Sequence, residues 1–178
     1  MIQNFQHDLQ LIVQAQIIPA LNQILMEYRV TKEFLRLLCY HSPIVPESHD
    51  DLMASALWCG FEHDFGNGIH LLAPQVEHLI RTLLKSKGVH TSNVDKEGVE
   101  NENGLSTLLD HPRSESILGE DLLFELKAVL TESVGPNLRN EVAHGLLNDS
   151  NSHSSASVYC WWLVLRLVIK SLYGSGKS

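Results

Sequence analysis

Positively charged residues are scarce in this sequence. Its 178 residues include 13 lysines and arginines against 21 aspartates and glutamates, which gives a formal net charge of −8. A surface that coats nucleic acid needs a basic face to displace counterions from the phosphates. The composition therefore argues against a broad nucleic-acid-coating surface. It leaves a small local phosphate site open, because net charge says little about one cleft.

Long hydrophobic runs are also missing. The most apolar stretch, residues 158–169, contains Arg166 and falls short of the roughly 18 consecutive apolar residues of a membrane span. The N-terminal residues have no basic region and include Asp8, so no signal peptide is predicted. Apolar residues make up 44% of the chain, enough for a sizeable core in one domain or a domain with an added lobe. We therefore predict a cytoplasmic protein with no membrane partner.

Cysteines and metal-binding motifs are few. The three cysteines lie far apart in apolar sequence and form no CxxC motif, which is typical of reduced, buried thiols: Cys39, Cys59 and Cys160. Ten histidines supply ligand types, as in residues 49–51 and 62–64, but HExxH and zinc-type Cys/His spacings are missing. The sequence thus predicts no metal and no cofactor.

Helical periodicity dominates the chain, and no period-two alternation with hairpin turn signals is found, so the predicted fold class is all-α. Pro19 predicts a kink or break in the first helical region. Two polar stretches, residues 89–103 and 148–157, are predicted to be loops. The apolar periodicity predicts helices over residues 9–25, 32–38, 52–63, 69–87, 105–109, 119–131, 138–147 and 158–173.

The clearest internal break in the sequence is Gly66-Asn67-Gly68. We place a domain boundary there. Residues 1–65 are then an N-terminal helical extension or the tail of a larger N-terminal region. Residues 66–174 form the main helical domain, and residues 175–178 a disordered tail.

Residues 135–145, with the sequence GPNLRNEVAHG, carry the most informative motif. Asn140 and His144 are four apart and share a helix face, whereas Arg139 lies about 140° from His144 but has a side chain long enough to curl over the turn. Arginine offers a planar fork of donors to a phosphate, and histidine can act as a general acid or base. In the plainer interpretation, His144 neutralises the helix dipole and Arg139 pairs with an acid.

Glu77 and Arg81 form a second pair, four residues apart on one face of the preceding long helix. They form either a surface ion pair of little energetic value or part of the same cleft as the motif. In the second case, Glu77 pairs with Arg139, and Arg81 adds positive charge.

Residues 139–144 (RNEVAH) resemble the R-N-x-x-x-H form of the motif of HEPN (higher eukaryotes and prokaryotes nucleotide-binding) domains. Together with residues 72–81 (LAPQVEHLIR) and 137–145 (NLRNEVAHG), they are similar to the C-terminal domain of a largely uncharacterised bacterial family in that superfamily. The resemblance covers about residues 68–173. Many HEPN domains are ribonucleases of toxin–antitoxin and antiphage or antiviral defence systems.

This resemblance implies a four-helix-bundle core with an N-terminal extension that forms a homodimer, with the Arg and His of both protomers at a shared cleft. It implies a metal-independent endoribonuclease with RNA as substrate and an antitoxin or regulatory protein as partner. His144 would transfer a proton while Arg139 holds the phosphoryl oxygens, and Asn140 would orient His144 or contact the phosphate. Glu77 and Arg81 would support them.

Two other functions compete with this one. The first is a non-catalytic module of the same fold that binds RNA, a nucleotide or a protein, which the acidic charge balance favours. The second is a structural helical bundle in which Arg139 merely forms an ion pair with Glu141 or Glu77.

Overall fold

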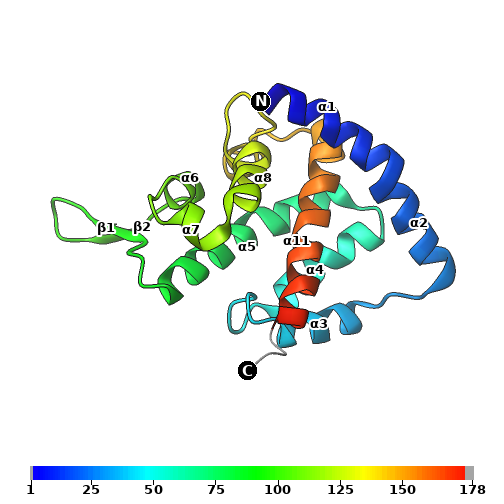
Figure 1. Ribbon diagram of the computed structural model, residues 1–178, viewed down its shortest axis with the longest axis horizontal. Helices are drawn as coiled ribbons and strands as arrows, with labels where there is room; N and C mark the ends of the chain where they lie inside the picture. Colours follow the sequence, from blue (N-terminus) through cyan, green and yellow to red (C-terminus); the bar gives the residue numbers. More distant parts are fainter. Residues whose placement is uncertain (1, 175–178) are drawn as a thin grey trace.

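The chain begins with one long helical rod, seen in the computed structural model, which describes residues 2–174 (Figure 1). The rod consists of α1 (Ile2–Ile12), a π-helical segment η1 (Val13–Ile17) and α2 (Ile18–Glu27). Pro19 does not break it. A proline ring removes one N–H and crowds the carbonyl four residues earlier, and the wider π turn before Pro19 relieves that crowding. Leu9, Val13, Ile17 and Leu21 line the buried side of the rod.

Two antiparallel-packed helices follow, α3 (Lys32–His41) and α4 (Asp50–Phe61). Thr31 caps α3, because its Oγ1 accepts a hydrogen bond from the Phe34 amide at 3.2 Å. After α4 the chain turns at His63, which adopts the left-handed conformation. Asp64 then caps the next helix by accepting a hydrogen bond from the Asn67 amide at 3.2 Å.

Helix α5 (Phe65–Ser86) is the longest helix and begins four residues before its predicted start. Gly66 and Gly68 therefore lie inside the helix, and the break that they predicted occurs at His63. The glycines serve close packing instead. A Cβ at Gly66 would lie 2.7 Å from the His153 ring, and one at Gly68 would lie 3.2 Å from Cys59 Cβ.

A small hairpin follows α5 and projects from the body (Figure 1). It is formed by β1 (Ser92–Val94) and β2 (Glu100–Glu102), which pair antiparallel with Ser92 opposite Glu102. This stretch was predicted to be a loop, and that prediction is wrong for these residues. No residue of either strand is buried, so the period-two signal of a half-buried strand is missing.

Six further helices complete the fold: α6 (Leu105–Leu109), α7 (Ser114–Leu118), α8 (Glu120–Leu130), α9 (Leu138–Ala143), α10 (Asp149–Ser152) and α11 (Ser155–Gly174). The all-α class is confirmed, with the hairpin as the sole sheet among the described residues. α9 is shorter than predicted because Gly145, with φ at 65°, turns the chain away. α10 lies in a tract predicted to be a loop. The predicted tail lies outside the described residues.

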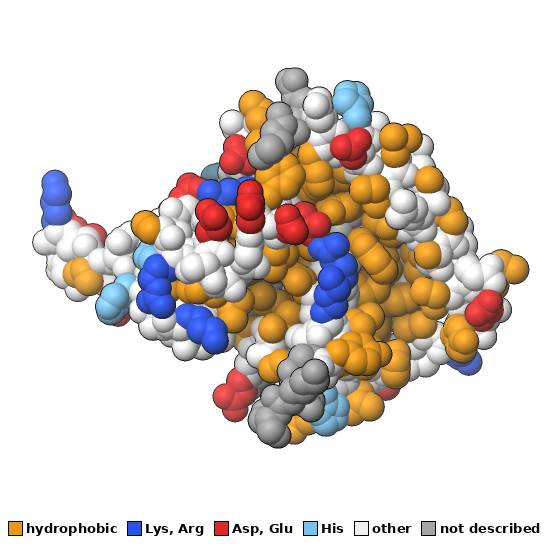
Figure 2. Space-filling view, viewed as in Figure 1, with side chains coloured by type: hydrophobic (Ala, Val, Ile, Leu, Met, Phe, Trp, Pro, Cys, Tyr) orange, Lys and Arg blue, Asp and Glu red, His pale blue; other side chains and the backbone are white. Residues whose placement is uncertain are grey.

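Helix α11 lies at the centre and contacts α1, η1, α3, α4 and α5 (Figure 1). Its Trp161 is buried, donates its indole N–H to the Leu57 carbonyl at 2.8 Å and packs on Gly60. Buried apolar residues on both sides of the predicted boundary at residue 65 form one core. Figure 2 shows further apolar side chains over the hollow between α11 and the α1–α2 rod.

Two helical stretches meet the length and composition of a membrane span, Asn4–Glu27 and Asp149–Tyr173. More than half of the most apolar part of the second stretch is buried in the protein, as expected for a core helix. The first is mostly exposed and lies near the N-terminus. Stretches of this kind also occur as core helices and signal sequences, so the cytoplasmic location stays a prediction.

Candidate functional site

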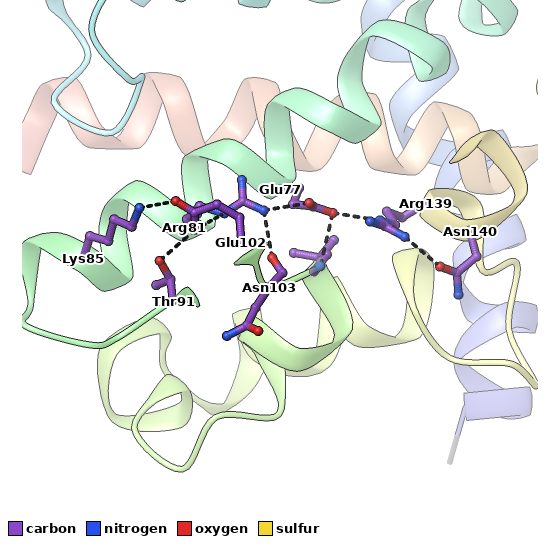
Figure 3. Close-up of polar contacts among 9 residues, drawn as sticks. Glu77, Arg81, Lys85, Thr91, Glu102, Asn103, Arg139 and Asn140 are labelled. Carbon is purple, nitrogen blue, oxygen red and sulfur yellow. Dashed lines mark hydrogen bonds and ion pairs between the residues drawn. The ribbon is translucent and has the colours of Figure 1, made fainter. Parts of the chain in front are cut away.

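The candidate site is centred on the carboxylate of Glu77, where α5 and α9 lie side by side (Figure 3). Glu77 Oε2 lies 2.7 Å from Arg139 Nε and accepts a hydrogen bond from the Leu105 amide at 3.1 Å. Its other oxygen, Oε1, accepts a hydrogen bond from Arg81 Nη2 at 2.7 Å. One carboxylate thus joins two arginines from different helices to the first residue of α6.

The surroundings of Glu77 keep its side chain charged. Partial burial raises the pKa of the carboxyl group, but hydrogen bonds from Arg139 and Arg81, the charge of Arg139 and the Leu105 amide together outweigh that effect. The net result is a pKa below the ordinary value. Glu77 is therefore ionised at neutral pH and holds both guanidinium groups in place.

Arg139 is fixed on its other side by the start of α9. Its Nη1 donates a hydrogen bond to Asn140 Oδ1 at 3.2 Å, and Asn140 Nδ2 in turn donates to Asn137 Oδ1 at 2.8 Å. Asn137 adopts the left-handed conformation, with φ at 50°, and directs the chain into α9. A Cβ at Gly104 would lie 3.3 Å from Arg139 Nη2, so this glycine leaves room for the guanidinium group.

Arg81 is held by the base of the hairpin. Its Nη2 donates to the Asn103 carbonyl at 2.8 Å, and its Nε lies 3.2 Å from Glu102 Oε2. Glu102 also contacts Lys85 and Thr91 (Figure 3). The hairpin and the α9 motif are consequently connected through a continuous row of charged side chains.

A pocket of about 350 Å³ opens beside the two arginines. Its polar lining is Glu77, Arg81 and Arg139, and its apolar lining is Ala73, Pro74, Val142 and Ala143. Larger hollows of about 520 and 480 Å³ lie along α1, but none of the predicted site residues lines them. The hollow of about 480 Å³ is lined by other residues of the motif segment, among them Gly135, Pro136, Leu138 and Glu141. The smaller pocket is the one that the two arginines line.

His144 lies apart from this cluster. It follows the last residue of α9, where its amide donates to the Asn140 carbonyl at 3.0 Å, and its side chain is exposed. Within residues 2–174, its imidazole forms no hydrogen bond, ion pair or ring contact, and it does not line the pocket. The structure thus brings together Glu77, Arg81, Arg139 and Asn140. The side chain of His144 is close to them in sequence but is exposed to solvent.

The geometry contains contributors that the sequence did not indicate. Glu102, Asn103, the Leu105 amide and Asn137 all hold members of the cluster. Asn137 had a recognisable signal, since an asparagine between Gly-Pro and a helix tolerates the left-handed conformation. Glu102 and Asn103 had none, because their role depends on a hairpin without an apolar pattern.

Metal ligands do not gather at this site. Within the described part of the chain, no three histidine, cysteine, aspartate or glutamate side chains are grouped so that they could hold a metal ion. The arginines supply positive charge at this site, and they outweigh Glu77 by one charge, against which Glu102 lies.

No protein-family model, curated protein or solved structure matches this chain.

Proposed function

We propose that this protein is a HEPN-type, metal-independent endoribonuclease whose site is built around Arg139 and His144. The observation that carries the proposal is the combination of a fixed guanidinium group on α9 and a free imidazole on the residue that directly follows this helix. Arg139 is held by Glu77 and Asn140, while His144, one turn after Asn140, is exposed and unpaired within the described residues. These two groups suit RNA cleavage through a 2′-hydroxyl, in which a cation binds the phosphoryl oxygens and an imidazole can move a proton.

The roles of the side chains follow from their chemistry. The 2′-hydroxyl attacks the adjacent phosphorus, the bond to the 5′-oxygen breaks, and a 2′,3′-cyclic phosphate and a 5′-hydroxyl are formed. His144 transfers a proton in this step. Arg139 binds the phosphoryl oxygens as negative charge builds on them, and Arg81 adds a second positive charge. Glu77 and Asn140 position Arg139.

A homodimer belongs to this proposal. Within one protomer, the guanidinium group of Arg139 faces Glu77, and the exposed side chain of His144 does not contact this guanidinium group. A second protomer across α9 would supply the other side of a shared cleft, as the HEPN resemblance implies. An antitoxin or other regulatory protein would restrain the activity in the cytoplasm, in toxin–antitoxin or antiviral defence.

The test is cleavage of a mixed structured RNA in excess EDTA. We expect cleavage by the wild type and a loss of at least about 100-fold with His144→Ala, in line with the contribution of a general acid or base. His90→Ala is the matched control, since His90 is exposed after α5 and lies outside the site. Equal cleavage by all three proteins would contradict the proposal.

One observation favours a non-catalytic binding module instead. His144 does not line the pocket, whereas both arginines do, so an anion could bind there without meeting an imidazole. In that case the wild type binds RNA or a nucleotide but does not cleave RNA. Arg139→Ala abolishes this binding, whereas His144→Ala binds like the wild type.

A further inference from the structure

The Nε atom of Arg81 is buried and has no hydrogen-bond acceptor among the described residues. Its neighbour Glu102 Oε2 is 3.2 Å away, close enough for an ion pair, but the N–H is not directed at that oxygen. The Nη2 atom of the same guanidinium group is well satisfied, since it donates to Glu77 and to the Asn103 carbonyl. A buried, unsatisfied donor next to a charged partner is costly and marks a place where a better acceptor would bind.

Glu77 and Glu102 hold Arg81 in different ways. Glu77 is only 16% exposed and also accepts the Arg139 and Leu105 hydrogen bonds, so it is part of the framework of the site. Glu102 is 47% exposed, comes from the hairpin and has alternative partners in Lys85 and Thr91. Glu102 can therefore leave Arg81 and keep its contacts with Lys85 and Thr91 at the protein surface. Glu77 is held in place by the Arg139 and Leu105 hydrogen bonds.

The charges give Glu102 a specific effect. Arg81 and Arg139 together exceed the charge of Glu77 by one, and Glu102 lies against this remaining positive charge. A phosphate that approaches Arg81 meets a carboxylate of the same sign at the same donor.

We propose that Glu102 is an internal competitor for the substrate phosphate at Arg81 and thereby sets the affinity of the site for phosphate groups. This inference rests on the proposed function and extends it from the α9 motif to the hairpin. On binding, a phosphate oxygen accepts the Arg81 Nε hydrogen bond, and Glu102 moves to Lys85 and Thr91. A partner protein that binds the hairpin and moves Glu102 would change the affinity of the site for phosphate.

The variant Glu102→Gln tests this role, with Glu100→Gln as matched control. Glu100 lies on the same strand two residues away, carries the same charge, and contacts Ser92 rather than Arg81. The probe is a fluorescent single-stranded RNA with 2′-deoxy substitutions, which cannot be cleaved through a 2′-hydroxyl. Glu102→Gln is expected to bind it about three- to fivefold more tightly than the wild type, the range of one exposed ion pair. Glu100→Gln is expected to bind like the wild type.

Two further measurements show whether the change in RNA binding arises at Arg81. In an Arg81→Gln background, Glu102→Gln is expected to have no effect on RNA binding, because the competed donor is gone. Inorganic phosphate is expected to raise the melting temperature of Glu102→Gln more than that of Glu100→Gln, since at one phosphate concentration the protein that binds phosphate more tightly is stabilised more.

The possible failures are distinct. If the wild type cleaves RNA but Glu102→Gln and Glu100→Gln bind alike, Glu102 is no competitor and the proposed function stands. If phosphate stabilises Glu102→Gln selectively but no protein binds or cleaves RNA, the role of Glu102 at Arg81 holds and the ribonuclease proposal falls.

Discussion

Glu77 and Arg139 form an ion pair of 2.7 Å across 62 residues of sequence, and this contact joins α5 to α9. The carboxylate that holds Arg139 also holds Arg81 and the first amide of α6. A single side chain therefore fixes the positions of the two arginines and of the segment that leads out of the hairpin.

Replacement of Glu77 by alanine is expected to lower the free energy of unfolding by about 2 kcal/mol, because it leaves two arginines and the Leu105 amide without their acceptor. The value is below that of a fully buried pair, since Arg139 is 27% exposed and partly screened by solvent. Urea unfolding measures the change. Glu47→Ala, at an exposed position, is the control and should change stability by less than about 0.5 kcal/mol. An equal loss in both variants would contradict the framework role of Glu77.

The contribution of Glu77 should also depend on pH. Because the pKa of Glu77 in the folded protein is below its ordinary value of 4.5, the folded state favours the ionised form. The stabilisation is then fully present above about pH 4.5 and is lost as the pH falls through the lowered folded pKa. We expect the stability difference between the wild type and Glu77→Gln to be constant from pH 7 to about pH 5 and to shrink in more acidic solution. Urea unfolding of both proteins across this range measures it, and a difference that grows on acidification would contradict the assignment.

Gly60 provides an independent test of the core. A Cβ at this position would lie 2.1 Å from Trp161 Nε1, and the ring is held by its hydrogen bond to the Leu57 carbonyl. Gly60→Ala is expected to cost about 2 kcal/mol or more of stability, since overpacking of a fixed ring forces the backbone to move.

The double variant shows whether Trp161 is the cause. Trp161→Phe alone loses a buried hydrogen bond, but in the Gly60→Ala background the smaller ring relieves the clash. The two losses of stability are therefore expected to be less than additive. Additive losses would show that Gly60→Ala destabilises the protein for a reason other than the clash with Trp161.

The sequence predicted most of the fold because the helices carry apolar stripes. In α8, Leu126, Val129 and Leu130 are buried, whereas Leu122 and Leu123 are half-buried. The prediction failed where the pattern is ambiguous. Gly66 and Gly68 predict a break by composition, but their environment in the folded protein requires small residues inside a helix. The hairpin was missed because its strands contain no buried residue.

The site was predictable in part for a similar reason. Glu77 and Arg81 lie on one predicted helix and Arg139 on another. The ion pair between Glu77 and Arg139 was expected under the interpretation that all three line one cleft. The contacts of Glu102 and Asn103 depend on where a polar hairpin packs, which no local pattern determines. The orientation of His144 toward solvent is likewise set by the end of α9 at Gly145.

The most direct test of the central proposal is the identity of the RNA ends produced in excess EDTA by the wild type and by His144→Ala. Proton transfer by His144 during attack of a 2′-hydroxyl predicts 2′,3′-cyclic phosphate and 5′-hydroxyl ends from the wild type. It also predicts that a single 2′-deoxy substitution at a cleaved position prevents cleavage there. His144→Ala should yield neither product. Cyclic ends formed equally by His144→Ala, or wild-type cleavage that leaves 5′-phosphate ends, would contradict the proposal.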